Sequence, residues 1–140
     1  MVVMYKFTVY GEPRGKGRPR FFRNRAYTDK ATAEYESRVR KAWKLEEHPY
    51  LAKQPTTVIV NAFFPVPVSL SKKKREAMFG APCLRKPDGD NIGKIILDAL
   101  NILAFEDDSQ IDTLRVVKRY VSGDDDRPRV EVEIIGGETK

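Results

Sequence analysis

The sequence has one cysteine, Cys83, one histidine, His48, and no apolar run long enough to span a bilayer. A single cysteine excludes an internal disulfide and a cysteine-rich zinc site, which fits a reducing compartment. His48 precedes a proline at the expected end of a helix, so a serine or cysteine triad is not expected. Residues 1–9 are interrupted by Lys6 and lack a signal-peptide layout, so we expect a cytoplasmic protein without a membrane partner.

Acidic residues are unevenly distributed along this basic chain. The 140 residues carry a net charge of +6, but residues 88–112 contain seven acids and one base and carry −6. The remaining residues therefore carry +12. This distribution indicates a protein that attracts a polyanion such as a nucleic acid and holds a cation against it.

Apolar periodicity and turn residues predict the secondary structure. Strands are predicted at residues 2–10, 56–66, 114–121 and 129–135, and helices at residues 30–47, 72–78 and 90–103. Thr28 or Asp29 is expected to cap the first helix, and residues 122–128 are expected to join the last two strands as a hairpin. The fold class predicted is α+β, as a single domain over residues 1–140 with helices on one face of a mixed sheet.

The main chemical signal is an acidic cluster around the third predicted helix. Asp88 and Asp90 stand at its start, Lys94 follows one turn later, and Asp107 and Asp108 lie in the turn before the next strand. Carboxylates are the ligands that Mg²⁺ prefers, and the ion activates water and stabilises charge in phosphodiester hydrolysis. A lysine nearby can neutralise charge that develops on the phosphate. Asp98 shares the row of Asp90 and Lys94, and its role stays open between outer ligand and surface charge.

Each of these groups also has an ordinary structural explanation. Asp88 or Asp90 can be a helix cap worth about 1 kcal/mol. The Asp90–Lys94 spacing can be a surface ion pair worth about 0.3–0.5 kcal/mol. Asp107 and Asp108 can form a solvated turn. Taken singly these explanations are favoured, but they explain less well why all the groups occur together with the local charge of −6.

The motif Lys-Pro-Asp-x-Asp-Asn-x-x-Lys, followed by Asp-Ala-Leu-Asn and Asp-Asp-Ser-Gln-Ile, resembles the core of the RusA family of Holliday junction resolvases. The opening Gly-Glu-Pro-x-Gly-Lys-Gly-Arg-Pro-Arg-Phe resembles family members from phages and prophages. The resemblance implies a homodimer that cuts one strand at each of two sites with Mg²⁺ or Mn²⁺. It places the essential aspartates at Asp88, Asp90 and Asp108 and the essential lysine at Lys94. We add Asp107, the neighbour of Asp108, as an assisting ligand by hypothesis. Gly89 departs from the pattern, which usually has Leu, Ile or Val there.

Two basic stretches are candidates for DNA contact. The first has no acid between its members and includes aromatic residues: Arg14, Lys16, Arg18, Arg20, Phe21, Phe22, Arg23, Arg25 and Tyr27. If this stretch is extended, the first four basic residues lie on one side, and exposed rings can stack on unpaired bases. The alternative is a solubilising loop with both phenylalanines in the core. The second stretch is residues 72–75, in which Lys73 and Lys74 contact a DNA backbone or belong to a solvated helix face.

These observations together predict a metal-dependent endodeoxyribonuclease that resolves four-way DNA junctions in recombination and repair. Two alternatives stay open. One is a metal nuclease acting on flaps, other branches or duplex DNA, and the other is a DNA-binding protein without catalytic activity, which needs the basic stretch but not the carboxylates.

Overall fold

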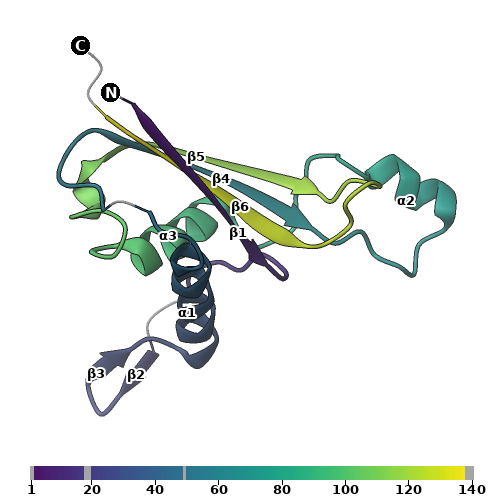
Figure 1. Cartoon of the computed structure of the whole chain (residues 1–140). Coiled ribbons are helices and arrows are strands. Elements are labelled where there is room, and N and C mark those ends of the chain that lie inside the picture. Colours follow the sequence, from purple (N-terminus) through teal and green to yellow (C-terminus); the bar gives the residue numbers. More distant parts are fainter. Residues whose placement is uncertain (1, 18–19, 49, 138–140) are drawn as a thin grey trace.

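The computed structural model describes residues 2–17, 20–48 and 50–137 (Figure 1). The chain runs through β1 (Val3–Tyr10), β2 (Arg20–Phe22), β3 (Arg25–Tyr27), α1 (Lys30–Lys44), β4 (Thr56–Phe64), α2 (Lys72–Met78), α3 (Gly89–Leu100), the 3₁₀ helix η1 (Asp108–Gln110), β5 (Ile111–Tyr120) and β6 (Arg129–Gly136). The prediction of an α+β chain with a mixed sheet is confirmed. Among the described helices, none is long and apolar enough to cross a membrane.

The main sheet has the strand order β1-β6-β4-β5. β6 pairs antiparallel with β1 and β4, whereas β4 and β5 are parallel. Parallel neighbours need a long crossover connection, and here it contains α2, α3 and η1. The acidic motif lies in this connection, between the end of β4 and the start of β5.

The predicted hairpin between the last two strands is wrong, because β4 lies between β5 and β6. Val130, Val132 and Ile134 of β6 are fully buried, so this strand gains more than β5 from an interior position in the sheet. No residue of β5 is buried and the strand carries charged residues along its length, which suits an edge strand. The eight-residue connection, residues 121–128, is long enough to cross the end of β4, and it is organised around Asp125, which accepts hydrogen bonds from Arg127.

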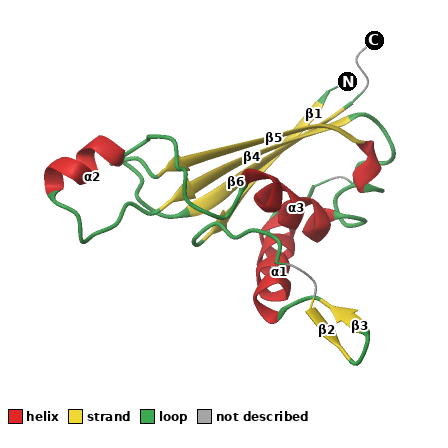
Figure 2. Ribbon diagram, turned by 180° about the vertical axis from the view of Figure 1, so that it is seen from behind, coloured by secondary structure: helices red, strands yellow, loops and turns green. Residues whose placement is uncertain are grey.

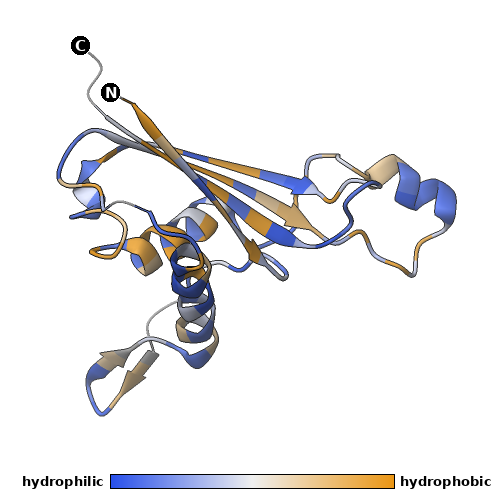
Figure 3. Ribbon diagram, in the orientation of Figure 1, coloured by the Kyte–Doolittle hydropathy of each residue, from blue (hydrophilic) through white to orange (hydrophobic). Residues whose placement is uncertain are grey.

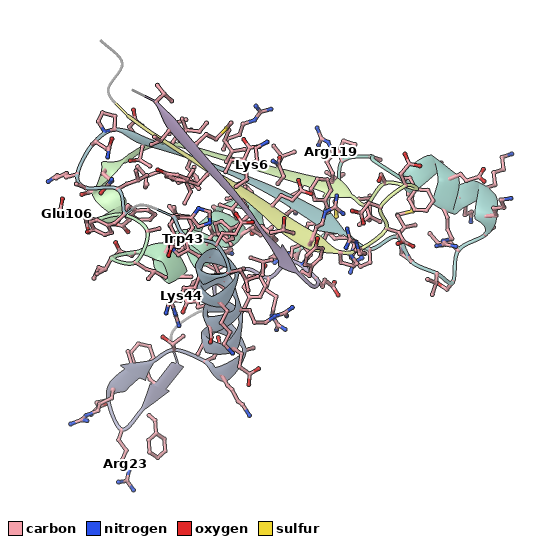
Figure 4. All side chains as sticks on the ribbon, viewed as in Figure 1. Lys6, Arg23, Trp43, Lys44, Glu106 and Arg119 are labelled. Carbon is pink, nitrogen blue, oxygen red and sulfur yellow. The ribbon has the colours of Figure 1, made fainter. Side chains whose placement is uncertain are left out.

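One face of the sheet is covered by α1 and α3 (Figure 2). Apolar and polar residues alternate along the strands (Figure 3), and in β4 every second residue is buried. The apolar face predicted for α1 packs as expected: Tyr35, Val39 and Trp43 are buried, and Trp43 lies between α1 and β1 (Figure 4). The prediction of helices on one face fails for α2, which buries no residue and stands beyond the end of the sheet (Figure 1).

The predicted helix starts are accurate to within one residue, whereas the predicted ends are accurate for α2 and too long for α1 and α3. Asp29 caps α1 by accepting a hydrogen bond from the backbone of Thr32, and Ser71 caps α2 in the same way from Lys74. α1 ends at Lys44 rather than near residue 47, and α3 ends at Leu100 rather than at Leu103. The chain turns after Leu100 with Ile102 in the left-handed region, and Leu103 then packs against the core from the following loop.

Candidate active site and nucleic-acid interface

The start of α3 presents three charged side chains to solvent. Asp88 is the N-cap residue, Asp90 lies in the first turn, Lys94 lies one turn later, and all three are exposed. The Asp88 carboxylate makes no capping hydrogen bond. In the part of the chain that the structure describes, no ion pair joins Asp90 to Lys94. Asp88 therefore occupies the cap position without a side-chain capping bond, and the surface ion pair is not observed among the described residues.

The core holds α3 in this position. Ile92, Ile95, Ile96 and Leu100 have no exposed surface, so the buried side of the helix is anchored along its length. Gly93 lies against the side chains of Leu114 and Val116 of β5. Gly89 is the first residue of α3 and lies near Val116, so the position that departs from the motif is helical rather than part of a loop.

Asp107 and Asp108 lie beyond the other end of α3. Asp107 caps η1 in a capping box with Gln110, and the hydrogen bonds that it accepts from Ser109 lower its pKa. Asp108 is exposed. The buried amide of Gln110 donates to the carbonyl of Ala52 and to the Thr56 hydroxyl, and thereby anchors η1 beside β4. Gln110 is a structural residue that the sequence analysis missed.

The structure does not bring all the predicted metal ligands together in one chain. The twelve residues of α3 span about 18 Å, and Asp88 and Asp90 lie at the end of the helix opposite Asp107 and Asp108. Over the described ranges, no group of three His, Cys, Asp or Glu side chains is close enough to hold a metal ion. The N-terminal end of α3 by itself offers two carboxylates.

Lys16 and Asp98 belong to a partly buried ion triad. The Lys16 ammonium lies 2.9 Å from a carboxylate oxygen of Glu36 on α1 and 3.1 Å from one of Asp98 on α3. Burial, the largest effect, lowers the pKa of Lys16, but the hydrogen bonds to Glu36 and Asp98 outweigh it, so the pKa is raised overall. Asp98 thus has a structural partner. Lys16, predicted to contact DNA, has its ammonium held between the two helices.

The segment around Lys16 is seated between α1 and α3. The Lys16 amide donates to the carbonyl of Asn91, and the Gly17 amide donates to the Thr32 hydroxyl. A Cβ atom at Gly15 would lie 2.7 Å from the Cβ atom of Pro87, so only glycine allows this close approach. Residues 12–17 therefore form a fixed segment, called the strap below, which precedes the β2–β3 hairpin.

The β2–β3 hairpin projects away from the body of the protein (Figure 1). Its turn has positive φ at Arg23 and Asn24, as a two-residue hairpin turn requires, and Arg23 stands at its tip (Figure 4). Phe21 is 75% exposed and Phe22 is 65% exposed, which excludes their burial in the core. The guanidinium of Arg23 lies over the ring of Phe22, 5.4 Å from its centroid.

The other predicted DNA contacts are spread over the molecule. Arg14 and Arg25 are exposed, whereas Arg18 and the side chain of Arg20 lie outside the described residues. Lys73 and Lys74 are exposed on α2, at the end of the sheet remote from η1 (Figure 1). Arg38 of α1 was missed, because no pattern in the helix distinguishes it from Arg40 and Lys41. Its guanidinium donates to the carbonyl of Tyr10 and lines a cleft with Arg14.

Comparison with known proteins decides the family. The model of the endodeoxyribonuclease RusA family matches residues 10–135, which is most of the chain. This chain belongs to the RusA family. It is also 40% identical to YqaN of Bacillus subtilis (strain 168), described as an uncharacterized protein, over 92% of this chain and 94% of the relative.

Membership of the RusA family identifies the chain as one of a family of endodeoxyribonucleases. The matched residues include the strap, the hairpin, α3 and η1, so they cover both the acidic and the basic features described above. The donors at the start of α3 suit a hard divalent ion, since Mg²⁺ is often bound through one or two carboxylates with water and substrate phosphate as the other ligands. The exposed Asp88 and Asp90 fit that role.

Proposed function

We propose that this RusA-family protein is a structure-selective endodeoxyribonuclease that resolves four-way DNA junctions as a homodimer with Mg²⁺, for which Mn²⁺ can substitute. The observation that carries the proposal is the set of exposed charges at the start of α3, Asp88, Asp90 and Lys94, which have no partner among the described residues. Pro87, which precedes Asp88, lines a cleft together with Arg14 and Arg38. A role in recombination and repair follows from the substrate.

The residues have distinct roles in this proposal. Asp88 and Asp90 hold the divalent ion, which when bound activates water and stabilises charge at the scissile phosphate. Lys94, one turn along the same helix, neutralises charge that develops on the phosphate oxygens. Asp108 is a third ligand on the strength of the motif. Asp107 is the weakest of the proposed ligands, because its carboxylate is already engaged in capping η1.

The β2–β3 hairpin is the proposed DNA-reading element. Arg23 and Arg25 supply positive charge, while Phe21 and Phe22 present rings on which unpaired bases at a branch point can stack. A junction centre offers both closely spaced phosphates and accessible bases. A continuous duplex offers no unpaired base, which is why we propose selectivity for branched DNA.

The decisive experiment incubates a labelled synthetic four-way junction with the protein and a series of divalent metals. We expect paired cuts with Mg²⁺ or Mn²⁺, none with EDTA, and weaker cutting of flap, fork and linear duplexes. Asp90→Asn should abolish cutting and preserve junction binding, because it removes a metal ligand and one charge that repels phosphate. Junction binding without cutting under every metal condition would favour a non-catalytic DNA-binding protein.

Asp88 and Asp90 are separated from Asp108 within one chain, so an experiment can test whether two chains of a homodimer share one active site. If Asp108 of a second copy completes the site at Asp88 and Asp90, mixing Asp90→Asn with Asp108→Asn protein yields mixed dimers in which one site is intact. Those mixtures should nick one strand although each variant alone is inactive. If all ligands come from one chain, the mixture stays inactive, and the sites are complete within each subunit.

A further inference from the structure

A cleft of about 530 Å³ lies beside the start of α3. It is lined by Glu12, Pro13, Arg14, Gly15, Arg38 and Pro87. Pro87 directly precedes Asp88, so the cleft borders the position of the proposed metal site. Its walls come from three separate parts of the chain: the strap, α1 and the entry to α3.

Arg38 is held so that part of its guanidinium remains available to a ligand. One Nη atom donates to the carbonyl of Tyr10, and the side chain as a whole is exposed. Gly11 makes room for this contact, since its φ is +113° and a Cβ atom there would lie 2.6 Å from the Arg38 Nη2 atom. A guanidinium has five N–H donors, so donors remain after one edge is fixed, and an oriented guanidinium suits the two oxygens of a phosphate.

The charge around the cleft favours an anion. Arg14 and Arg38 line it, and the one lining carboxylate, Glu12, already pairs with Arg85 at 3.6 Å. The Tyr35 hydroxyl is buried and, within the described part of the chain, has no hydrogen-bond partner. Burial raises the pKa of Tyr35, and the positive charges of Arg38 and then Arg14 act in the opposite direction.

We propose that this cleft binds a backbone phosphate of the DNA strand next to the one cut at Asp88 and Asp90, with Arg38 and Arg14 as its ligands. The inference rests on the proposed function for the identity of the cut strand. The phosphate contact fixes where the strand lies relative to the carboxylates. Arg38 and Arg14 are therefore binding residues that position the scissile bond, whereas Asp88, Asp90 and Lys94 act on it.

The test measures junction binding in EDTA, where cutting cannot occur. A fluorescently labelled four-way junction is titrated with Arg38→Gln, Arg14→Gln and wild-type protein between 50 and 200 mM salt. Loss of one phosphate contact should weaken binding by about 3- to 10-fold and flatten the log–log salt slope by about 0.9 for each variant. The matched control is Lys44→Gln, which removes one exposed charge from the last turn of α1, away from the cleft, and should leave the slope unchanged.

A second arm identifies the phosphate itself. Neutral methylphosphonates are placed singly around the cut position of the junction. One position should weaken binding of wild-type protein and have no further effect on Arg38→Gln or Arg14→Gln. Arg14→Gln disturbs no hydrogen bond found among the described residues, so it keeps the test valid if Arg38→Gln unfolds.

The outcomes separate this inference from the proposed function. Arginine variants that match Lys44→Gln, or a methylphosphonate effect that persists undiminished in them, would overturn the phosphate site. If the predicted binding losses appear but no junction is ever cut, the phosphate site stands and the proposed nuclease activity fails. If the junction is cut and the arginine variants bind normally, the nuclease activity stands and the phosphate site fails.

Discussion

Replacing Lys16 by methionine isolates the ion triad that connects the strap to both helices. Methionine keeps most of the side-chain length and removes the charge. Lys16 makes a charge-assisted hydrogen bond to Glu36 at 2.9 Å and an ion pair with Asp98 at 3.1 Å. The Asp98 side chain is 32% exposed, so solvent screens its share and reduces the loss there to about 1 kcal/mol.

The larger cost comes from Glu36. Its side chain is only 11% exposed, and without Lys16 its carboxylate loses its charged partner in a mostly buried position. A lost charge-assisted bond of this kind costs about 2 kcal/mol after partial relief by protonation. The total of about 3 kcal/mol corresponds to a fall in melting temperature of about 10 °C for a chain of this length.

The assay is reversible urea and thermal unfolding at pH 8, with Lys30→Met as the matched control. Lys30 pairs with Glu34 at 3.9 Å, and its side chain is 90% exposed, so its loss should cost less than about 0.5 kcal/mol. The raised pKa of Lys16 means that its stabilisation is fully present below pH 10.5 and is lost as the pH rises further. The difference between wild type and Lys16→Met should therefore shrink above that pH. Equal effects of the two lysine substitutions at pH 8 would refute the assignment of the triad.

Three further predictions follow from buried and exposed groups. Replacing Phe21 and Phe22 by serine should leave the melting temperature unchanged, because both rings are exposed, and weaken junction binding at least 10-fold in fluorescence titrations. Tyr35→Phe should leave stability unchanged or raise it by up to about 1 kcal/mol at pH 7, since it removes a buried hydroxyl that lacks a partner among the described residues. Burial raises the pKa of Tyr35 to about 12, so the wild type should lose stability between pH 10 and 12 more steeply than Tyr35→Phe in urea titrations. Gln110→Ala should cost about 2–3 kcal/mol in the same titrations, because it removes the donor to the Ala52 carbonyl and the Thr56 hydroxyl. Three results would contradict these assignments. They are a Gln110→Ala protein as stable as wild type, the same loss of stability between pH 10 and 12 in wild type and Tyr35→Phe, and unchanged junction binding by the double serine variant.

Local features of the fold were predictable because their causes are local. Periodicity located α3, and the cap candidates Thr28 and Asp29 marked the start of α1. Strand pairing was not predictable, since β5 and β6 follow each other in sequence yet β4 separates them. Which strand takes an interior position depends on apolar burial summed over the whole sheet.

The features of the candidate site also separate into those that local sequence indicates and those that only packing decides. The sequence by itself indicated the family, the row of Asp90 and Lys94 on one helix, and the basic aromatic stretch, because these depend on residue types and short spacings. Tertiary structure alone decided that Lys16 is held by Glu36 and Asp98, and that Arg38 shares a cleft with Arg14. These contacts join residues more than 19 positions apart, and only the packing of α1, α3 and the strap sets their distances.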